Sequence, residues 1–211
     1  EHKLGPAETN TKQAQGLFVV LPDKGVTEQI GDPYSGAYFY YSGAGNDLDN
    51  WMTKSFTLAP GSSLTAKANV QIELDWDYAY LVVSADGGET WDNVETSLST
   101  SFDPFGQNFG FGITGDSGGW VDLTADLSAY TGDVLLGFRY WTDVAAVEPG
   151  FMVDDISISG YPLDDAESDA GWTFDGFRLT TGEESAFYFN AYVGEFRQYR
   201  GYDAGLANAY N

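Results

Sequence analysis

The sequence of 211 residues contains no cysteine, and it has only one histidine and nine basic side chains. Without cysteine there are no disulfides, no thiolate nucleophiles and no cysteine-ligated zinc. The histidine is His2, so the chain has no H-E-x-x-H zinc motif, no Ser-His-Asp triad and no imidazole base. A Gly-rich phosphate loop followed by Lys-Ser or Lys-Thr is also missing. These absences exclude the usual hydrolytic mechanisms for this chain.

Positive charge is scarce, because 32 acidic residues give a formal net charge of -23. Such a charge repels phosphate backbones and favours cation uptake, so we expect no nucleic-acid partner. No apolar run approaches the roughly 18 residues of a membrane span. Residues 1–6 lack the apolar core of a signal peptide, and we expect a mature or internal piece of a secreted, extracellular protein.

The sequence is rich in aromatic residues, in glycine and in Asp and Asn at turns, which is typical of an all-β protein. Short apolar runs bounded by turn residues predict strands at 17–21, 37–41, 52–58, 64–74, 78–84, 91–95, 120–126, 134–142 and 151–159. We predict a jelly-roll β-sandwich over residues 17–160. Residues 1–16 are predicted to be a lead-in or linker, and 161–211 the truncated start of a second β segment, in which the acidic run at 164–169 marks the boundary before new aromatic strands.

One local motif predicts a β-hairpin. The spacing S-x-D-x-G-x-T-W, known as an Asp-box, is met by Ser84, Asp86, Gly88, Thr90 and Trp91. The Asp side chain can accept hydrogen bonds from the N–H groups of the turn, and glycine permits positive φ. We expect a structural role for this turn, with a ligand contact as the less favoured alternative.

Two adjacent acids interrupt the apolar segment 150–158. Strand alternation places Asp154 on the same face as Met152, Ile156 and Ile158, so its carboxylate is predicted to point inward. A buried charge needs a partner, and a chain this poor in bases favours Ca²⁺ bound by oxygen ligands. The alternative is that Asp154 satisfies backbone donors of a neighbouring loop. Further candidate ligands are Asp155 and two pairs at i, i+2 spacing, Asp47 with Asp49 and Asp75 with Asp77, although for each pair taken alone turn capping or a solvated edge is the favoured interpretation.

Exposed aromatic residues on a jelly-roll face can stack on sugar rings. Trp51 and Trp76 are the candidates for such a ligand contact, together with Trp120, Trp141 and the aromatic run 38–41. Most strand aromatics are core residues, and we favour that role for these.

Several segments together resemble, in order, the region that follows the catalytic domain in immune inhibitor A-type metallopeptidases, the M6 family. They are D-W-D-Y-A-Y-L at 75–81, the Asp-box, G-G-W-V-D-L-T-A-D-L-S-A-Y at 118–130, F-R-Y-W-T-D at 138–143, G-F-M-V-D-D-I at 150–156, W-T-F-D-G-F at 172–177, E-F-R-Q-Y at 195–199 and G-Y-D-A-G-L at 201–206. The resemblance implies a MAM-like accessory region of a secreted bacterial zinc endopeptidase, with bound calcium for which Asp154 is the best candidate. The zinc-binding helix of the family has no counterpart here.

We therefore expect a non-catalytic accessory domain with structural Ca²⁺ and no zinc of its own. Its expected partners are the catalytic domain of the same polypeptide and protein or glycan substrates. The alternative is a carbohydrate-binding module of an extracellular enzyme.

Overall fold

The computed structural model describes residues 3–209, which form two compact units. One unit comprises residues 29–184, and the other combines residues from the two ends of the chain, within 1–28 and 185–211. Residues 3–209 contain twelve strands and one 3₁₀ helix. Among these residues no helix is long and apolar enough to cross a membrane.

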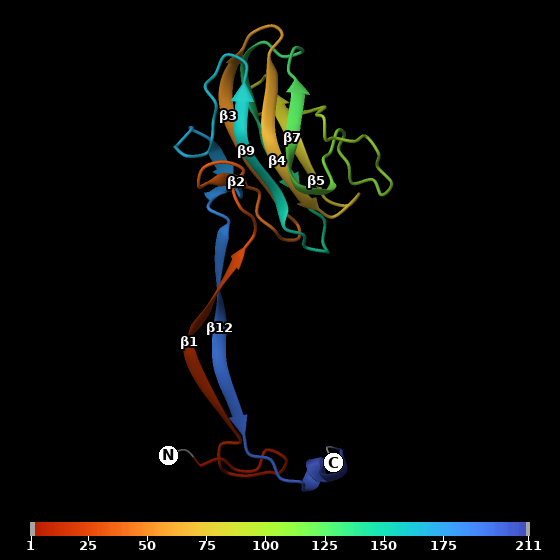
Figure 1. The fold of residues 1–211 in the computed structure, drawn as a ribbon. Helices are drawn as coiled ribbons and strands as arrows, with labels where there is room; N and C mark the ends of the chain where they lie inside the picture. The colour runs from red at the N-terminus through yellow and green to blue at the C-terminus, as the bar shows by residue number, and fades with distance from the viewer. Residues whose placement is uncertain (1–2, 210–211) are drawn as a thin grey trace. The chain divides into compact units, whose positions relative to one another are not determined.

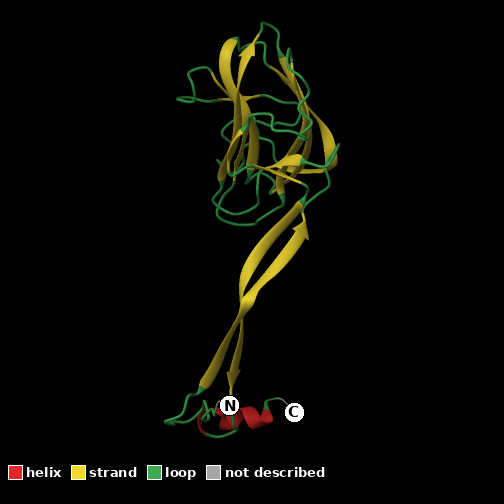
Figure 2. Cartoon of the chain, turned by 90° about the vertical axis from the view of Figure 1, so that its left-hand side faces the viewer, coloured by secondary structure: helices red, strands yellow, loops and turns green. Residues whose placement is uncertain are grey.

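The larger unit is a sandwich of two five-stranded antiparallel sheets (Figures 1 and 2). The first sheet has the order β10 (Thr173–Asp175), β3 (Asp49–Leu58), β8 (Gly132–Trp141), β5 (Tyr78–Ser84) and β6 (Asp92–Val94). The second has the order β11 (Arg178–Thr180), β2 (Phe39–Tyr41), β9 (Gly150–Ile158), β4 (Ser63–Ile72) and β7 (Gly115–Asp126). Most successive strands lie in opposite sheets, as in a jelly roll, so the predicted fold class is confirmed.

Apolar side chains from both sheets fill the space between them. Leu81 on β5 and Phe138 on β8 are fully buried, and the Phe138 ring lies 5.6 Å from that of Phe151 on β9. Burying one such side chain stabilises the fold by about 1.5–3 kcal/mol. The β3 and β8 backbones are closely packed at Gly137, where an added Cβ would lie 1.9 Å from the Met52 carbonyl oxygen.

The outer faces of the two sheets are also partly covered. On the first sheet, one buried aromatic and aliphatic cluster consists of Tyr78, Tyr80 and Val82, with Trp51, Trp91 and Trp141 packed against it. On the second sheet, the corresponding cluster consists of Phe39, Tyr41 and Met152, with Ile30 and Trp120 packed against it. Polar groups on these faces can therefore be buried without lying in the main core.

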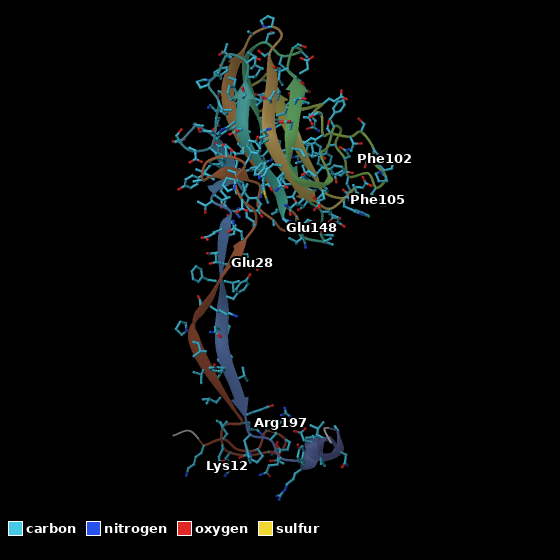
Figure 3. All side chains as sticks on the ribbon, in the orientation of Figure 1. Lys12, Glu28, Phe102, Phe105, Glu148 and Arg197 are labelled. Atoms are coloured by element: carbon cyan, nitrogen blue, oxygen red, sulfur yellow. The ribbon has the colours of Figure 1, made fainter. Side chains whose placement is uncertain are left out.

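The smaller unit is built on a two-stranded ribbon of β1 (Gly16–Gln29) and β12 (Glu183–Glu195), which extend to the division between the units. The rings of Phe18 and Phe189 stack at 5.9 Å on the ribbon. Beyond it, the Ala7 N–H donates to the Phe196 carbonyl, and η1 spans Gly201–Asn208. Figure 3 labels Lys12 and Arg197 in this unit.

The structure places the unit boundaries elsewhere than the predicted positions at residues 16 and 160. The predicted strand at 17–21 is part of β1 and pairs with β12, not with a sandwich strand. Conversely, β10 and β11 lie beyond residue 160, yet β10 pairs with β3 and β11 with β2, completing both sheets. Apolar runs in a sequence indicate strands but not their partners, which are distant along the chain here.

Candidate metal centre

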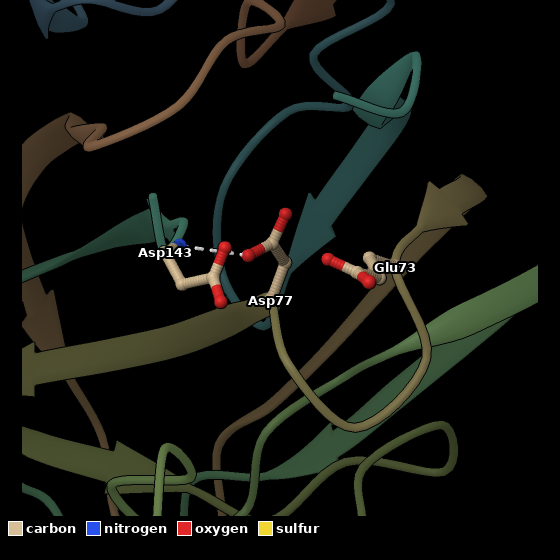
Figure 4. A group of neighbouring side chains, drawn as sticks. All are labelled: Glu73, Asp77 and Asp143. Atoms are coloured by element: carbon tan, nitrogen blue, oxygen red, sulfur yellow. Dashed lines mark hydrogen bonds between the residues drawn. The ribbon is translucent and has the colours of Figure 1, made fainter. Parts of the chain in front are cut away.

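Three carboxylates meet at one end of the sandwich (Figure 4). Glu73 follows β4, Asp77 immediately precedes β5, and Asp143 follows β8. Each contributes an oxygen atom to a group in which all the atoms lie within 4.8 Å of one another. Asp77 is 1% exposed, and the other two residues are partly buried.

A tight turn between β4 and β5 positions Glu73 and Asp77. The N–H groups of Trp76 and Asp77 donate to the Glu73 carbonyl at 3.4 and 3.2 Å. Asp75 within the turn has a φ of 66°, in the left-handed region that Asp tolerates better than most residues. The Thr114 hydroxyl holds the turn from the side, since it accepts from the Asp75 N–H and donates to the Glu73 carbonyl, both at 3.0 Å.

Backbone contacts hold Asp143 against this turn. Its N–H donates to Asp77 Oδ1 at 2.8 Å, and its carbonyl accepts from the Asp47 N–H at 2.6 Å. Its own carboxylate accepts from the Ala145 N–H at 2.9 Å. The pairing of Tyr78 with Trp141 across β5 and β8 brings the two segments together.

Burial and like charges make this cluster electrostatically unfavourable when fully ionised. Burial is the largest cause that raises the pKa of Asp77, to about 6. The Asp143 N–H opposes this shift, while the charges of Asp143, Glu73 and Glu148 add to it. Burial, Asp143 and Glu148 also raise the pKa of Glu73. Glu148 lies between β8 and β9 and is labelled in Figure 3.

The donor set fits a hard divalent cation. Carboxylate oxygens converging from two loops are the ligands that Ca²⁺ takes, and Ca²⁺ accepts irregular geometries. A cation would also remove the like-charge repulsion that raises the pKa of Asp77.

Asp154 lies elsewhere, on the outer side of the second sheet. It is 0% exposed, and its Oδ2 accepts from the N–H groups of Tyr34 and Ser35, both at 3.1 Å. Its Oδ1 accepts from the Asp155 N–H at 2.8 Å. Burial raises the pKa of Asp154, and these three donors oppose the shift. The donors account for a buried carboxylate without an ion, which is the alternative stated from the sequence.

A β-bulge makes the simple alternation argument for β9 wrong. The β4–β9 register shifts between Thr65 and Lys67, and Asp155 opposite this shift has a φ of 47°. The extra residue reverses the alternation. Asp154 therefore shares a face with Met152, as predicted, but Ile156 points into the main core on the other side.

The remaining predicted ligands are dispersed. Asp155 accepts from the Ser35 hydroxyl at 2.8 Å. Exposed Asp49 forms a bidentate ion pair with Arg139, at 2.7 and 2.9 Å. The Asp47 N–H donates to the Asp143 carbonyl, but the Asp47 and Asp75 carboxylates are not part of the cluster of Glu73, Asp77 and Asp143. Of the predicted ligands, the structure brings only Asp77 into the cluster.

Sequence reasoning missed Glu73 and Asp143. The acids of E-L-D-W-D recur at i, i+2 and i+4, so Glu73 carried a signal in the sequence. Asp143 follows an apolar strand directly, and strand ends on one edge of a sheet converge. Neither signal identifies which strand ends meet, because that depends on strand order.

The turn between β5 and β6 holds the Asp-box residues. Asp86 Oδ1 accepts from the Thr90 N–H at 2.9 Å, and Asp86 Oδ2 from the Thr90 hydroxyl at 2.5 Å. Ser84 Oγ donates to Asp86 at 2.7 Å and accepts from the Gly88 N–H at 2.8 Å. The Thr90 donors are the main cause that lowers the pKa of Asp86 well below its ordinary value. Trp91 packs on the outer aromatic cluster of the first sheet.

The two tryptophans considered for sugar stacking are engaged by other side chains. Trp76 stacks on Phe105 with a centroid distance of 4.0 Å and an interplanar angle of 11°. Arg139 lies over Trp51 at 4.8 Å, and Trp51 also packs on Trp91 at 5.2 Å. Phe105 is on the exposed loop after β6, where it is labelled in Figure 3. These contacts give no support to a carbohydrate site at either ring.

Comparison with known proteins gives three findings. A family model described as "Immune inhibitor A-like, MAM domain" matches residues 1–182. The pre-pro-metalloprotease PrtV of Vibrio cholerae serotype O1, in two strains, is 34% identical over 207 residues, which are 95% of this chain. The chain spans only 22% of the length of these relatives. A crystal structure of a cleaved adhesin domain of Lys-gingipain from Porphyromonas gingivalis is 14% identical, covering 66% of this chain and 99% of that chain with a TM-score of 0.32.

Proposed function

This chain belongs to the immune inhibitor A-like MAM domain family, and we propose on that premise that it is a non-catalytic accessory domain of a secreted M6-type zinc metallopeptidase. In this proposal the sandwich stabilises the peptidase or orients protein substrates, and structural calcium maintains it. The observation that carries the proposal is the match to a metalloprotease along 95% of a chain that has no zinc-binding motif of its own.

The residues of this chain explain why we assign catalysis to another domain. Zinc hydrolysis needs histidine ligands and a general base, and His2 is the chain's single histidine. The catalytic domain of the same polypeptide would supply them and is the proposed partner. The large negative charge favours solubility in an extracellular protein. The name of the relative, pre-pro-metalloprotease, accords with export.

We place the structural calcium at Glu73, Asp77 and Asp143. Glu73 and Asp77 come from the turn between β4 and β5, and Asp143 comes from the segment after β8, so an ion bound to all three would tie the ends of β4, β5 and β8 together. The like charges around Asp77 supply the reason for an ion here, since ionising the buried cluster without a cation is unfavourable.

The proposal is tested in the full-length peptidase with the pair of substitutions Asp77→Asn and Asp133→Asn. Asp133 is exposed and accepts from the Thr57 hydroxyl, so it is a matched change of charge away from the centre. We expect Asp77→Asn to lower thermal stability in calcium and to impair cleavage of folded proteins more than cleavage of a short peptide. The isolated chain should hydrolyse neither substrate. Turnover by the isolated chain would refute the non-catalytic assignment.

A further inference from the structure

A cavity of about 230 Å³ lies in the sandwich between β3, β9 and the segment that precedes β10. Aromatic and aliphatic side chains form much of its wall, among them Phe56, Ile156, Ile158, Leu163 and Trp172. Lys54, Asp164 and Asp165 also line it. Phe56, Ile156, Ile158 and Trp172 are buried, whereas Leu163 is exposed at the rim. The cavity therefore has one wall of buried apolar side chains and reaches the surface.

Lys54 points into this cavity from β3. Met52, Phe56 and Leu58 are buried on the inner face of β3, and Lys54 has the same parity in the strand. Its Nζ lies 5.4 Å from the centroid of the Phe56 ring and 5.7 Å from that of Trp172. A lysine on the inner face of a sandwich is unusual, because an ammonium group loses hydration there.

This ammonium has no carboxylate partner within residues 3–209, although the chain has more than three acids for each base. Lys67, by contrast, lies over the Tyr34 ring at 4.5 Å and pairs with Asp122 at 2.6 Å. Two acids line the cavity, and both are engaged by other donors: Asp165 Oδ1 accepts from the Glu167 N–H at 3.3 Å, and Asp164 has three donors. The Asp164 oxygens accept from the Tyr40 hydroxyl at 2.9 and 3.1 Å, from Trp172 Nε1 at 2.5 Å and from the Ala166 N–H at 3.1 Å.

We propose that this pocket binds a carboxylate attached to a single apolar group of amino-acid size. The apolar group would lie against Phe56, Ile156 and Ile158, and the carboxylate would pair with Lys54 Nζ. An apolar cavity of about 150 Å³ is enough for benzene, so this one has room for a branched or aromatic side chain with a short acid. Among the described residues that line the pocket, only Lys54 is basic, which selects a monocarboxylate. The site is independent of the metal centre and of the proposed accessory role.

Such a ligand is found free or as the C-terminal residue of a peptide, and calorimetric titration of the whole chain distinguishes the two sources. The probes are N-acetyl-leucine, N-acetyl-phenylalanine, their amides, and a short peptide ending in leucine with a free or an amidated C-terminus. For ligands of this size we expect roughly millimolar affinity, and binding of each amide weaker by about tenfold or more. If the free-acid peptide binds as well as N-acetyl-leucine, the ligand is a peptide end. If only the small acids bind, it is a free carboxylate.

The matched variants are Lys54→Met and Lys67→Met, which remove the same charge from two ring-stacked lysines. We expect Lys54→Met to weaken binding of the acids about tenfold and Lys67→Met to leave it unchanged. A second measurement, NMR of the unsubstituted protein, does not depend on the folding of a variant. The acids should shift the indole N–H resonance of Trp172, and the amides should not. No binding, equal binding of acids and amides, or an unaltered affinity in folded Lys54→Met would overturn the proposal.

Discussion

The Asp77 centre predicts that calcium and pH act on stability together. The folded pKa of Asp77, about 6, lies above its ordinary value of 3.8, so the folded protein holds this proton more tightly than the unfolded chain does. Without a metal, the free energy of unfolding should therefore fall as the pH rises from about 4 to 6. A shift of this size corresponds to about 3 kcal/mol.

Calcium should reverse this loss, because the ion binds the ionised carboxylate and the folded state alone. At about 100 times its Kd it would add about 2.7 kcal/mol, which raises the Tm of a chain of this size by roughly 5–10 °C. The gain should be largest at pH 7 and small at pH 4.5, where Asp77 holds its proton.

The assay is thermal unfolding in EDTA and in calcium across pH 4.5–7, for the unsubstituted chain, Asp77→Asn and Asp133→Asn. An asparagine can still accept from the Asp143 N–H but carries no charge. In EDTA at pH 7, Asp77→Asn should be at least as stable as the unsubstituted chain, and it should lose the calcium gain. A gain of equal size at pH 4.5 and 7, or one retained by Asp77→Asn, would refute the reasoning.

Three further predictions concern residues outside the centre. Asp154→Asn places an amide among three backbone donors, so it should cost about 1–3 kcal/mol equally in EDTA and in calcium, as measured by urea unfolding; a loss confined to calcium would instead make Asp154 a ligand. Gly137→Ala should destabilise the sandwich by about 1–3 kcal/mol or more, because its Cβ would meet the β3 backbone, whereas Gly194→Ala, with open space around it, should have little effect on the same urea midpoint. Asp86→Ala should lower Tm at pH 7, and this loss should shrink as the pH falls below the ordinary pKa of Asp, because an acid with a lowered pKa stabilises the fold only when ionised; a loss of Tm that does not change with pH would contradict this role.

The all-β class could be predicted from the sequence because apolar runs and turn residues act locally. The run at 134–142 became β8 and the run at 151–159 became β9 with few changes at their ends. The domain boundaries could not be predicted from the sequence, because the strands that pair with β1 and β10 are more than a hundred residues away along the chain. Such pairings are decided by the packing of the whole chain.

The candidate site was predictable only in part. Scarcity of bases correctly indicates that a buried acid needs some other partner, but it does not distinguish a cation from backbone donors. At Asp154 three N–H groups fill this role, and at Asp77 one N–H is present beside three other acids. The single extra residue at Asp155 also reversed the strand alternation, and the sequence carries no clear signal for a bulge there.

The central claim is most directly tested by a crystal structure of the chain grown in saturating calcium. The account predicts an ion with oxygens of Glu73, Asp77 and Asp143 at about 2.3–2.6 Å. Density for an ion at Asp154 instead, or three carboxylates with none between them, would contradict it.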